Sequence, residues 1–308
     1  MNTKTKIVLI LSVEEDQSTM NVIEWLVLMN QPFVLLHPDD LINFSFNNKK
    51  YYIEVNNRKL NLDDIKSFWY RRGFITLKKI QNTKKELDWI VLDENKSILD
   101  FLYFLLENKL HINKRSDNSI NKLTTLIIAE KCGLLIPKSY YNSSEFGKEK
   151  KITKTIVGSA SFIKDNKVYM MFTKTISNKE LTENYEFKYT QERILKKYEL
   201  RIFYLHDKLW SMAIFSQKDN QTKVDFREYN LIKPNRNVPY SLPNHIEKKI
   251  KNLMKTLDIN SGSIDMIVSK ENKYIFLEVN PIGQFGMTSY PCNYKIEKEI
   301  AKYLIHEK

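Results

Sequence analysis

The first apolar positions of the chain follow the pattern of a strand, a helix and a second strand. Residues 6–11 are a nearly continuous apolar run of the kind that is buried on both faces of a parallel sheet. Residues 18–29 carry apolar side chains at helical spacing, and residues 33–36 form a second apolar run after Pro32. This order predicts a βαβ opening.

Further apolar runs extend this opening into an N-terminal α/β domain. Residues 51–55 and 59–62 have the pattern of a hairpin around Asn56-Asn57. A further strand over residues 67–72 ends in two arginines, for which we favour a structural role over peptide binding. A long helical pattern covers residues 84–110, and we expect the domain to end near residue 112.

A polar connector at residues 113–119 precedes the rest of the chain. A helix over residues 121–132 follows, and Gly133 and Pro137 give it a normal C-terminal signature. Beyond it the pattern predicts mainly strands, with two helices near the C-terminus. The expected strands cover residues 152–157, 162–163, 168–173, 192–199, 200–205, 209–216 and 222–227, and the expected helices cover residues 246–257 and 296–305.

Residues 262–280 contain two β-branched and aromatic runs around a polar Lys-Glu-Asn-Lys turn, which predicts a hairpin. If the loop is even-numbered, Asp265 lies directly opposite Glu278, and Asn280 shares the face of Glu278. Like charges directly opposite are destabilising, and oxygen ligands suit a hard cation such as Mg²⁺. The hairpin therefore indicates a metal patch. The alternatives are a surface hairpin with solvated acids, or an odd loop that breaks the pairing.

Pairs of polar residues at i, i+2 spacing recur in the C-terminal half. They are Glu199 with Arg201, Asp225 with Arg227, and Glu278 with Asn280. On strands each pair shares a face, so together they indicate a charge-lined sheet face that suits phosphate or an acyl oxyanion, the alternative being a solvated face.

Lys154 precedes the small-residue segment Gly158-Ser159-Ala160-Ser161. That arrangement suits phosphate binding, although a simple tight turn is the commoner meaning of such a segment.

Composition excludes several function classes. The chain has 308 residues, 42% hydrophobic and 12% aromatic, which is typical of a folded globular protein. Its formal charge of +12 implies an acidic partner, but the lysines are scattered and no aromatic-basic motif favours nucleic acid. The apolar run at residues 7–11 is too short for a signal peptide or a membrane span, so we expect no membrane partner. Cys132 and Cys292 lack metal-type spacing and predict reduced thiols in a cytoplasmic protein.

Several motifs together resemble the ATP-grasp ligases, and most closely the microviridin-type graspetide synthetases, including the grasp-with-spasm peptide maturases. The resemblance runs through nearly the whole chain. It rests on Phe68-Trp69-Tyr70-Arg71-Arg72, Asn121-Lys122-Leu123, Lys154, Glu192-Arg193-Ile194 with Glu199 and Arg201, Val224-Asp225-Phe226-Arg227, and Asp265 with Glu278-Val279-Asn280-Pro281.

The resemblance implies an ATP-grasp fold with three parts. These would be a pre-ATP-grasp α/β domain over residues 1–112, a central small subdomain over 113–190, and a C-terminal antiparallel-sheet subdomain over 191–308 that carries the Mg²⁺–ATP site. Phe226 stands where relatives often carry Trp, and the segment after Lys154 is poorer in glycine than in many relatives.

The resemblance also implies a role for each candidate site residue. Lys122 and Lys154 would hold the ATP phosphates. Glu192, Arg193 and Ile194 would form the adenine hinge, and Glu199 would meet the ribose. Asp265, Glu278 and Asn280 would hold Mg²⁺. Arg201 and Arg227, with Asp225 beside them, would stabilise the transferred phosphoryl group and the acyl phosphate.

The implied reaction is macrocyclisation of a ribosomally made precursor peptide with an acidic core. Asp or Glu side chains would be activated as acyl phosphates and attacked by Thr or Ser, giving ω-esters, or by Lys, giving ω-amides. Two alternatives are an ATP-grasp ligase that adds amino acids to a peptide or protein terminus and a non-catalytic module that binds ATP or a peptide. The sequence leaves open the precursor, ester or amide choice, ring order, leader-binding surface and oligomeric state, with a homodimer as one option.

Overall fold

In a computed structural model of the protein, the chain forms two compact units, each with its own sheets and helices. Unit 1 comprises Met1–Ser119, Gln284–Gly286 and Lys295–Lys308, and unit 2 comprises Ile120–Gly283 and Met287–Tyr294. The structure describes residues 6–78, 84–142, 150–157, 161–165, 167–177, 180, 189–228 and 230–306. The expected boundaries after residues 112 and 190 stay predictions. The return of the last segments to unit 1 was not anticipated from the sequence.

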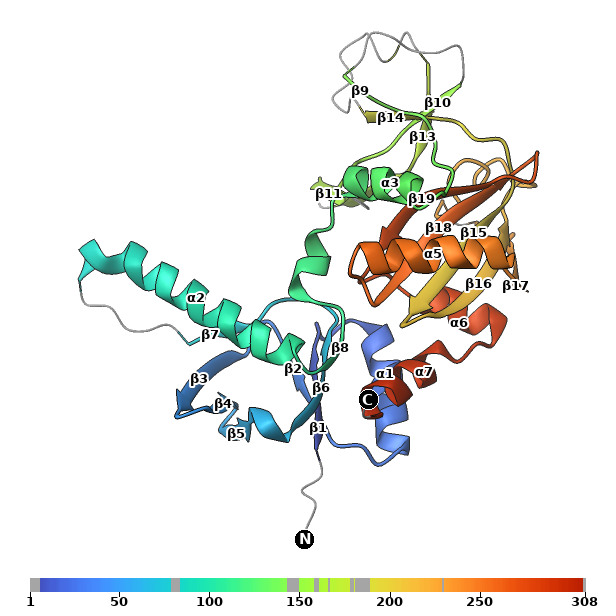
Figure 1. Ribbon diagram of the computed structural model, residues 1–308. Coiled ribbons are helices and arrows are strands. Elements are labelled where there is room, and N and C mark those ends of the chain that lie inside the picture. The colour runs from blue at the N-terminus through green and yellow to red at the C-terminus, as the bar shows by residue number, and fades with distance from the viewer. Residues whose placement is uncertain are drawn as a thin grey trace. The chain divides into compact units, whose positions relative to one another are not determined.

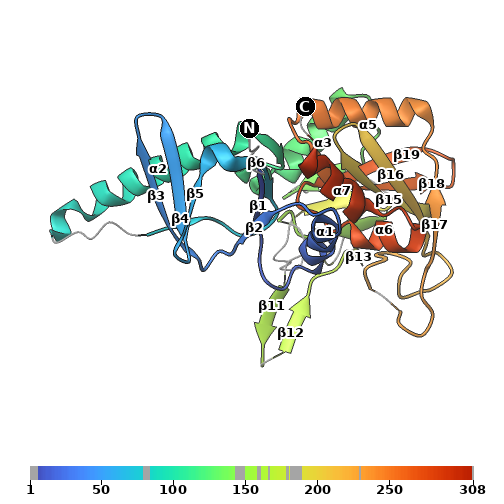
Figure 2. The same ribbon diagram turned by 90° about the horizontal axis from the view of Figure 1, so that it is seen from below.

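Unit 1 contains the parallel sheet that the βαβ pattern predicts. Its strand order is β2-β1-β6-β8, with every pair parallel (Figure 1). Helices α1 (Gln17–Leu28) and α7 (Ile296–Ile305) lie side by side (Figure 2), and the Ser67 hydroxyl of β6 donates to the Leu304 carbonyl at 2.7 Å. The four strands are β1 (Ile7–Leu11), β2 (Phe33–Leu36), β6 (Ile65–Tyr70) and β8 (Leu110–Ile112).

A second sheet of unit 1 has the order β5-β4-β3-β7. The predicted hairpin turn is present, and Asn56 and Asn57 both adopt positive φ, at 49° and 61°, which asparagine tolerates better than most residues. Helix α2 (Asp88–Glu107) packs Phe101 against Phe44, with ring centroids 6.3 Å apart. The strands are β3 (Leu41–Asn47), β4 (Lys50–Val55), β5 (Arg58–Asn61) and β7 (Thr76–Leu77).

The predicted long helix over residues 84–110 is too long at both ends. Its first residues form a 3₁₀ turn at Lys85–Leu87, and its last predicted residue, Leu110, starts strand β8. Helical periodicity alone does not show where a sheet takes over the chain. Two further 3₁₀ turns lie at Leu62–Asp64 and Arg115–Ser119.

Unit 2 is built on an antiparallel sheet in the order β17-β16-β15-β18-β19 (Figure 1). This sheet confirms the antiparallel C-terminal architecture that the sequence predicts. Its strands are β15 (Lys196–Leu205), β16 (Lys208–Phe215), β17 (Arg236–Tyr240), β18 (Ser261–Ser269) and β19 (Tyr274–Asn280).

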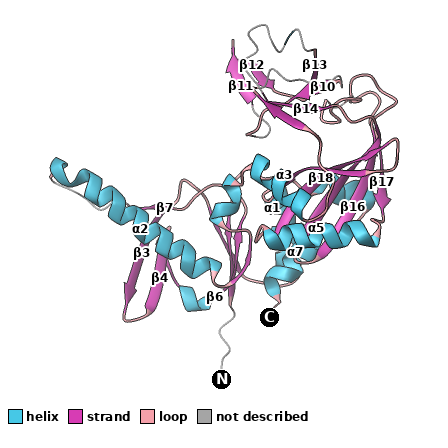
Figure 3. Ribbon diagram, turned by 45° about the horizontal axis from the view of Figure 1, so that its top comes forward, coloured by secondary structure: helices cyan, strands magenta, loops and turns pink. Residues whose placement is uncertain are grey.

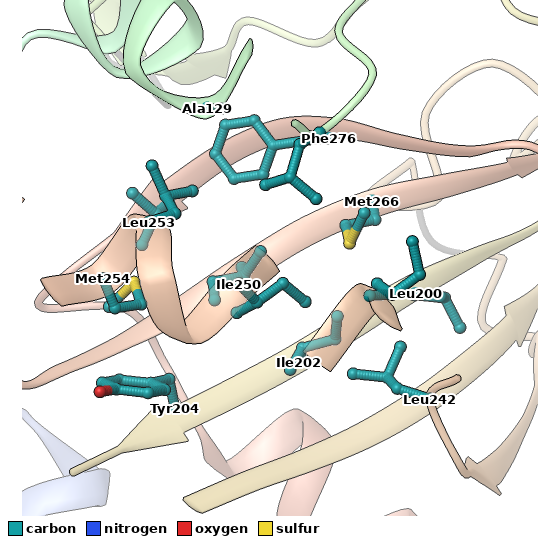
Figure 4. Packing of buried hydrophobic residues seen from close by; sticks show 14 of the residues in the cluster. Ala129, Leu200, Ile202, Tyr204, Leu242, Ile250, Leu253, Met254, Met266 and Phe276 are labelled. Atoms are coloured by element: carbon teal, nitrogen blue, oxygen red, sulfur yellow. The ribbon is translucent and has the colours of Figure 1, made fainter. Parts of the chain in front are cut away.

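One face of this sheet is covered by α3 (Lys122–Lys131) and α5 (Asn244–Thr256). Their apolar side chains and those of the strands form the core shown in Figure 4, where Leu200, Ile202 and Phe276 lie among residues of α5. Because side chains alternate along a strand, residues 199 and 201 lie on the opposite face from Leu200 and Ile202. The core therefore fixes which face of the sheet carries the charged residues.

A smaller antiparallel sheet in unit 2 has the order β13-β10-β14-β9, and a separate hairpin pairs β11 with β12 (Figures 1 and 3). The predicted strands at 152–157 and 168–173 are shorter in the structure, and β9 and β13 were not predicted. The bounds are β9 (Ser139–Tyr141), β10 (Lys151–Thr153), β11 (Ser161–Lys164), β12 (Lys167–Met170), β13 (Lys174–Ile176) and β14 (Tyr189–Glu192).

Two further sequence predictions about unit 2 are wrong. Residues 222–227 are not a strand, because side chains satisfy the backbone there: Gln217 Nε2 donates to the Lys223 carbonyl at 3.1 Å, and the Asp225 carboxylate accepts from the Arg227 N–H at 3.0 Å. The expected strand over 192–199 is interrupted between β14 and β15. Helix α6 (Gly286–Cys292) was not expected.

The cysteines behave as the sequence predicts. Both are free, and Cys292 is buried against Met212 and Ile214 as a small packing residue. In the described part of the chain, no helix is both long enough and apolar enough to cross a membrane.

Candidate nucleotide and phosphoryl-transfer site

The candidate site is an open pocket in unit 2. Its lining comes from β10, β14, β15, β18, β19 and the segment between β16 and β17. Predicted site residues among that lining are Lys154, Glu192, Arg193, Ile194, Glu199, Asp225, Arg227, Asp265 and Glu278. Of the other predicted residues, Lys122 and Asn280 bond to Glu278, and Arg201 bonds to Asp265. The structure therefore brings every predicted site residue to one region.

The hairpin of β18 and β19 pairs Asp265 with Glu278, as predicted, but by a different route. The loop is odd, because Val268 pairs with Tyr274 and Met266 pairs with Phe276. A one-residue bulge at Leu277 then restores the register, so that Asp265 faces Glu278. The expectation that an odd loop breaks this pairing is therefore wrong.

Asn280 lies beside Glu278 as the alternation predicts, and its Nδ2 donates to Glu278 Oε1 at 3.2 Å. The chain turns immediately afterwards, with the Gly283 N–H donating to the Asn280 carbonyl at 3.0 Å. A Cβ at Gly283 would lie 2.5 Å from the Cβ of Ser263, so glycine is needed for this close approach.

Glu278 is held by two lysines from different parts of unit 2. Lys122 Nζ, at the first position of α3, donates to Glu278 Oε2 at 2.9 Å, and Lys154 Nζ lies 3.6 Å from the same oxygen. Burial disfavours the charged carboxylate, but Lys154 and Lys122 outweigh it and lower the pKa of Glu278 to about 2. Burial likewise lowers the pKa of Lys154, against the opposing effect of Glu278.

Helix α3 presents Lys122 because Asn121 caps its N-terminus. The Asn121 side chain accepts from the Leu123 and Thr124 N–H groups at 2.9 and 3.1 Å. The cap fixes where the helix begins, and the lysine follows directly after it.

Arg201 on β15 is the cross-strand partner of Asp265 on β18. Its Nη1 donates to both carboxylate oxygens, at 2.7 and 2.6 Å. The side chain is 9% exposed, and its Nε has no hydrogen-bond partner among the residues that the structure describes. Arg201 therefore keeps donor capacity for a ligand oxygen.

Asp225 and Arg227 bond to each other directly, although they lie in a turn and not on the strand that the sequence predicts. Arg227 Nε and Nη2 donate to the two oxygens of Asp225 at 2.9 and 2.6 Å, and the Thr173 N–H donates to Asp225 at 3.0 Å. Burial opposes ionisation of Asp225, but Arg227 and these bonds lower its pKa. Hydrogen bonding to Asp225 raises the pKa of Arg227.

The predicted hinge residues lie where β14 ends. The Glu192 carboxylate accepts from the Lys138 N–H at 3.0 Å, and the Arg193 N–H donates to the Lys150 carbonyl at 2.7 Å. Glu199, seven residues on, is buried, and burial raises its pKa to about 7 in spite of its bonds to Lys196 and Ser216.

Lys196 is a site residue that the sequence did not single out. It lines the pocket and pairs with Glu199, three residues along β15. In a regular strand these residues face opposite sides, so their spacing gave no signal. A bulge between Lys196 and Tyr198 in the pairing with β18 changes that alternation.

The segment after Lys154 stays a prediction as a phosphate-binding loop. Gly158, Ser159 and Ala160 lie outside the described residues, and Ser161 begins β11.

Comparison with known proteins gives a clear result at the level of structure. No protein-family model matches the sequence, and no curated protein sequence matches it. A Chryseobacterium gregarium RiPP-associated ATP-grasp ligase, solved with ADP and a leader and core peptide, is 25% identical with a TM-score of 0.78, and the match covers 97% of this chain and 95% of that one.

Two further solved structures agree with it. Macrocyclase MdnC from Microcystis aeruginosa MRC, bound with precursor peptide MdnA, is 26% identical with a TM-score of 0.76, covering 98% of this chain and 100% of that one. The ATP-grasp ligase PsnB, solved with minimal precursor, Mg and ADP, shares the fold at 14% identity and a TM-score of 0.71, over 97% of both chains. The chain therefore has the ATP-grasp fold, and along nearly its whole length it is similar to RiPP-associated ATP-grasp ligases, in keeping with the graspetide-type resemblance of its motifs.

Proposed function

We propose that this protein is an ATP-dependent ligase that macrocyclises a ribosomally made precursor peptide. A carboxylate oxygen of an Asp or Glu side chain attacks the γ-phosphorus of ATP, which releases ADP and leaves an acyl phosphate on the peptide. A Thr or Ser hydroxyl, or a Lys amine, of the same peptide then attacks the acyl carbon. Phosphate leaves, and an ω-ester or ω-amide ring remains.

The observation that carries this proposal is the arrangement of cations around two carboxylates in one pocket. Arg201 holds Asp265, and Lys122 and Lys154 hold Glu278. Phosphoryl transfer needs positioned positive charge and little covalent help from the protein. The lysines and arginines of this pocket supply that charge: Arg201 lies on β15, Lys122 begins α3, and Lys154 directly follows β10.

The donor set fits Mg²⁺. Asp265 and Glu278 face each other, Asn280 adds an amide oxygen, and the lowered pKa of Glu278 keeps its carboxylate ionised. Hard oxygen donors of this kind suit Mg²⁺, which usually binds through one or two carboxylates together with substrate phosphates. When bound, the ion would neutralise charge on the ATP phosphates.

We assign the remaining residues by their places in the pocket and by the family resemblance. Lys122 and Lys154 exchange Glu278 for the ATP phosphates. Glu192, Arg193 and Ile194 hold the adenine, and Glu199 meets the ribose. Arg201 and Arg227 stabilise the transferred phosphoryl group and the acyl phosphate, and Asp225 holds Arg227 in place through the two bonds described above.

The proposed partner is an acidic precursor peptide with a leader and a core. The structure of the C. gregarium ligase contains a leader and core peptide, and that of MdnC contains the precursor peptide MdnA. The formal charge of +12 on this chain would attract a substrate rich in carboxylates.

Mass spectrometry tests the proposal. The protein is incubated with Mg²⁺–ATP and a precursor peptide encoded beside its gene, and the peptide mass is followed together with ADP release. Macrocyclisation removes one water for each ring formed. A gain of residue masses would instead identify a ligase that extends a peptide, and background ADP release with every such peptide would identify a binding module.

A further inference from the structure

The two oxygens of the Glu199 carboxylate have different surroundings. Oε1 accepts from Lys196 Nζ and from the Ser216 hydroxyl, the latter at 3.1 Å. Within the described parts of the chain, Oε2 accepts no hydrogen bond. Because Glu199 lines the pocket, one oxygen is fixed by the protein and the other remains available to a ligand hydroxyl.

Lys196 makes a second contact, which links Glu199 to the arginine-bearing segment. Its Nζ donates to the Val224 carbonyl at 3.0 Å, and Val224 directly precedes Asp225. Gln217 Nε2 reinforces the link, because it donates to the Ser216 hydroxyl at 3.1 Å and to the Lys223 carbonyl at 3.1 Å. A continuous hydrogen-bond network therefore joins β15 to the segment that carries Asp225 and Arg227.

The burial of Lys196 makes these contacts specific. Its side chain is 6% exposed, and that of Glu199 is 8% exposed. The next lysine, Lys197, is exposed, and among the described residues it bonds only to the Asn272 side chain, at 2.6 Å. A buried ammonium is costly unless it is paired and hydrogen-bonded, and Lys196 has both partners.

We propose that Lys196 is a positioning residue for the nucleotide. It holds Glu199 so that the second carboxylate oxygen meets a ribose hydroxyl, and through Val224 it fixes the Asp225–Arg227 segment beside the same ligand. This inference rests on the proposed function, since it takes the pocket to be a nucleotide site. It assigns to Lys196 a role that neither its spacing nor the family motifs indicated.

A purely structural ion pair would make a different prediction. If Lys196 only stabilised the fold, its loss would weaken the binding of all nucleotides alike. If it orients Glu199, its loss would weaken the binding of those nucleotides whose ribose hydroxyl contacts Glu199 more than the binding of those that lack it. The contrast between ADP and its 2′-deoxy and 3′-deoxy analogues separates these roles.

The experiment is isothermal titration calorimetry of the full-length protein with Mg²⁺ and each of these three nucleotides. We expect the wild type to bind ADP ~10-fold more tightly than at least one deoxy analogue, as a hydrogen bond to a charged group allows. Lys196→Met should bring the affinities for ADP and for that analogue to about the same value, because the loss for ADP exceeds any loss for the analogue that release of the Asp225–Arg227 segment causes. Lys197→Met is the matched control and should retain the wild-type ratio.

Ser216→Ala gives an independent measurement should Lys196→Met fail to fold. Ser216 donates to the same oxygen as Lys196, so its removal should reduce the ratio of ADP affinity to analogue affinity, but ADP should still bind more tightly than the analogue. If Lys196→Met keeps the wild-type ratio of ADP affinity to analogue affinity, the positioning role is overturned. The same holds for Ser216→Ala if Lys196→Met does not fold. The role is also overturned if the wild type binds ADP and both deoxy analogues equally tightly. A wild type that binds no ADP overturns the proposed function itself.

Discussion

Arg201 and Asp265 are direct cross-strand partners on β15 and β18, and Arg201 Nη1 lies 2.7 and 2.6 Å from the two carboxylate oxygens of Asp265. Because β19 pairs Asp265 with Glu278 on the other side, three neighbouring strands each contribute one charged residue to a single row. The row joins a cation that can meet a phosphoryl group to carboxylates that can meet Mg²⁺.

Arg201→Lys should impair the chemical step more than nucleotide binding. Lysine keeps the positive charge but loses the planar fork that leaves donors for a developing oxyanion. We expect kcat for ATP consumption, with a peptide that the wild type modifies, to fall ~10²–10³-fold. ADP affinity, measured by calorimetry, should change much less. Arg236→Lys, at an exposed position of β17, is the control, and a kcat for Arg201→Lys equal to that of the control would remove Arg201 from the reaction.

Glu278→Gln should abolish peptide-dependent ATP consumption and leave the fold intact. The amide retains the shape but removes the charge that Lys122, Lys154 and the metal patch require. We expect the apparent Mg²⁺ affinity to weaken at least ~10–100-fold, as judged by the Mg²⁺ dependence of ADP release. Circular dichroism checks the fold, and Glu271→Gln in the turn of the same hairpin is the control. Asn280→Ala should weaken Mg²⁺ affinity in the same direction. Normal ATP turnover in either Glu278→Gln or Asn280→Ala contradicts the metal assignment.

Asp16→Asn should destabilise unit 1. The Asp16 carboxylate caps α1, forms an ion pair with Arg71 Nε at 2.7 Å, and accepts a hydrogen bond from Arg72 Nε at 2.8 Å. Asp16 and Arg71 are almost fully buried, so Asp16→Asn removes the negative charge that pairs with the buried Arg71, at a cost of about 3–5 kcal/mol. Urea unfolding followed by circular dichroism measures this loss.

Two comparisons define the role of Asp16. Glu15→Gln, at the exposed neighbouring position, should leave the unfolding midpoint unchanged. Arg72→Ala should cost less than Asp16→Asn because its side chain is 38% exposed. An unchanged midpoint in Asp16→Asn would mean that the arginines after β6 do not serve the structural role that their contacts indicate.

The sequence predicted the fold well where burial imposes a period on it. The apolar run at residues 7–11 predicted a parallel strand because both of its faces are buried, and the Asn56-Asn57 turn predicted a hairpin from the φ values that asparagine allows. Helix ends and short strands were less predictable. Leu110, for example, satisfies a helical period but joins β8 through contacts with β6, which is distant in sequence.

The site was predicted as a set of residues, but not with its true geometry. Two bulges, at Leu277 of β19 and beside Lys196 of β15, shift the alternation next to the pocket. The first made the pairing of Asp265 with Glu278 compatible with an odd loop. The second brought Lys196 to Glu199 against the strand period. A bulge is determined by the packing of neighbouring strands, so residue spacing within one strand does not reveal it.

The pocket should also give the protein an uncommon dependence of stability on pH. Burial raises the pKa of Glu199 from its ordinary 4.5 to about 7, so between these values the folded state holds a proton that the unfolded chain releases. That contribution to stability is present at the acidic end of the window and is lost as pH rises, by up to about 3 kcal/mol. Glu278 has the opposite effect. With its pKa lowered to about 2, it stabilises the fold above 4.5 and loses that effect as pH falls from 4.5 to 2.

Glu199→Gln isolates the first of these effects, because the glutamine oxygen still accepts from Lys196 but does not titrate. We expect the wild-type free energy of unfolding in urea to decrease between about pH 5 and about pH 8, and the variant to show a flatter profile across the same range. Glu130→Gln, at an exposed position of α3, should follow the wild type. Parallel profiles for wild type and Glu199→Gln would show that Glu199 titrates alike in the folded and unfolded chain. The Glu199 carboxylate that Lys196 holds would then ionise at the pKa of the unfolded chain, and acidification of this pocket would add nothing to the free energy of unfolding.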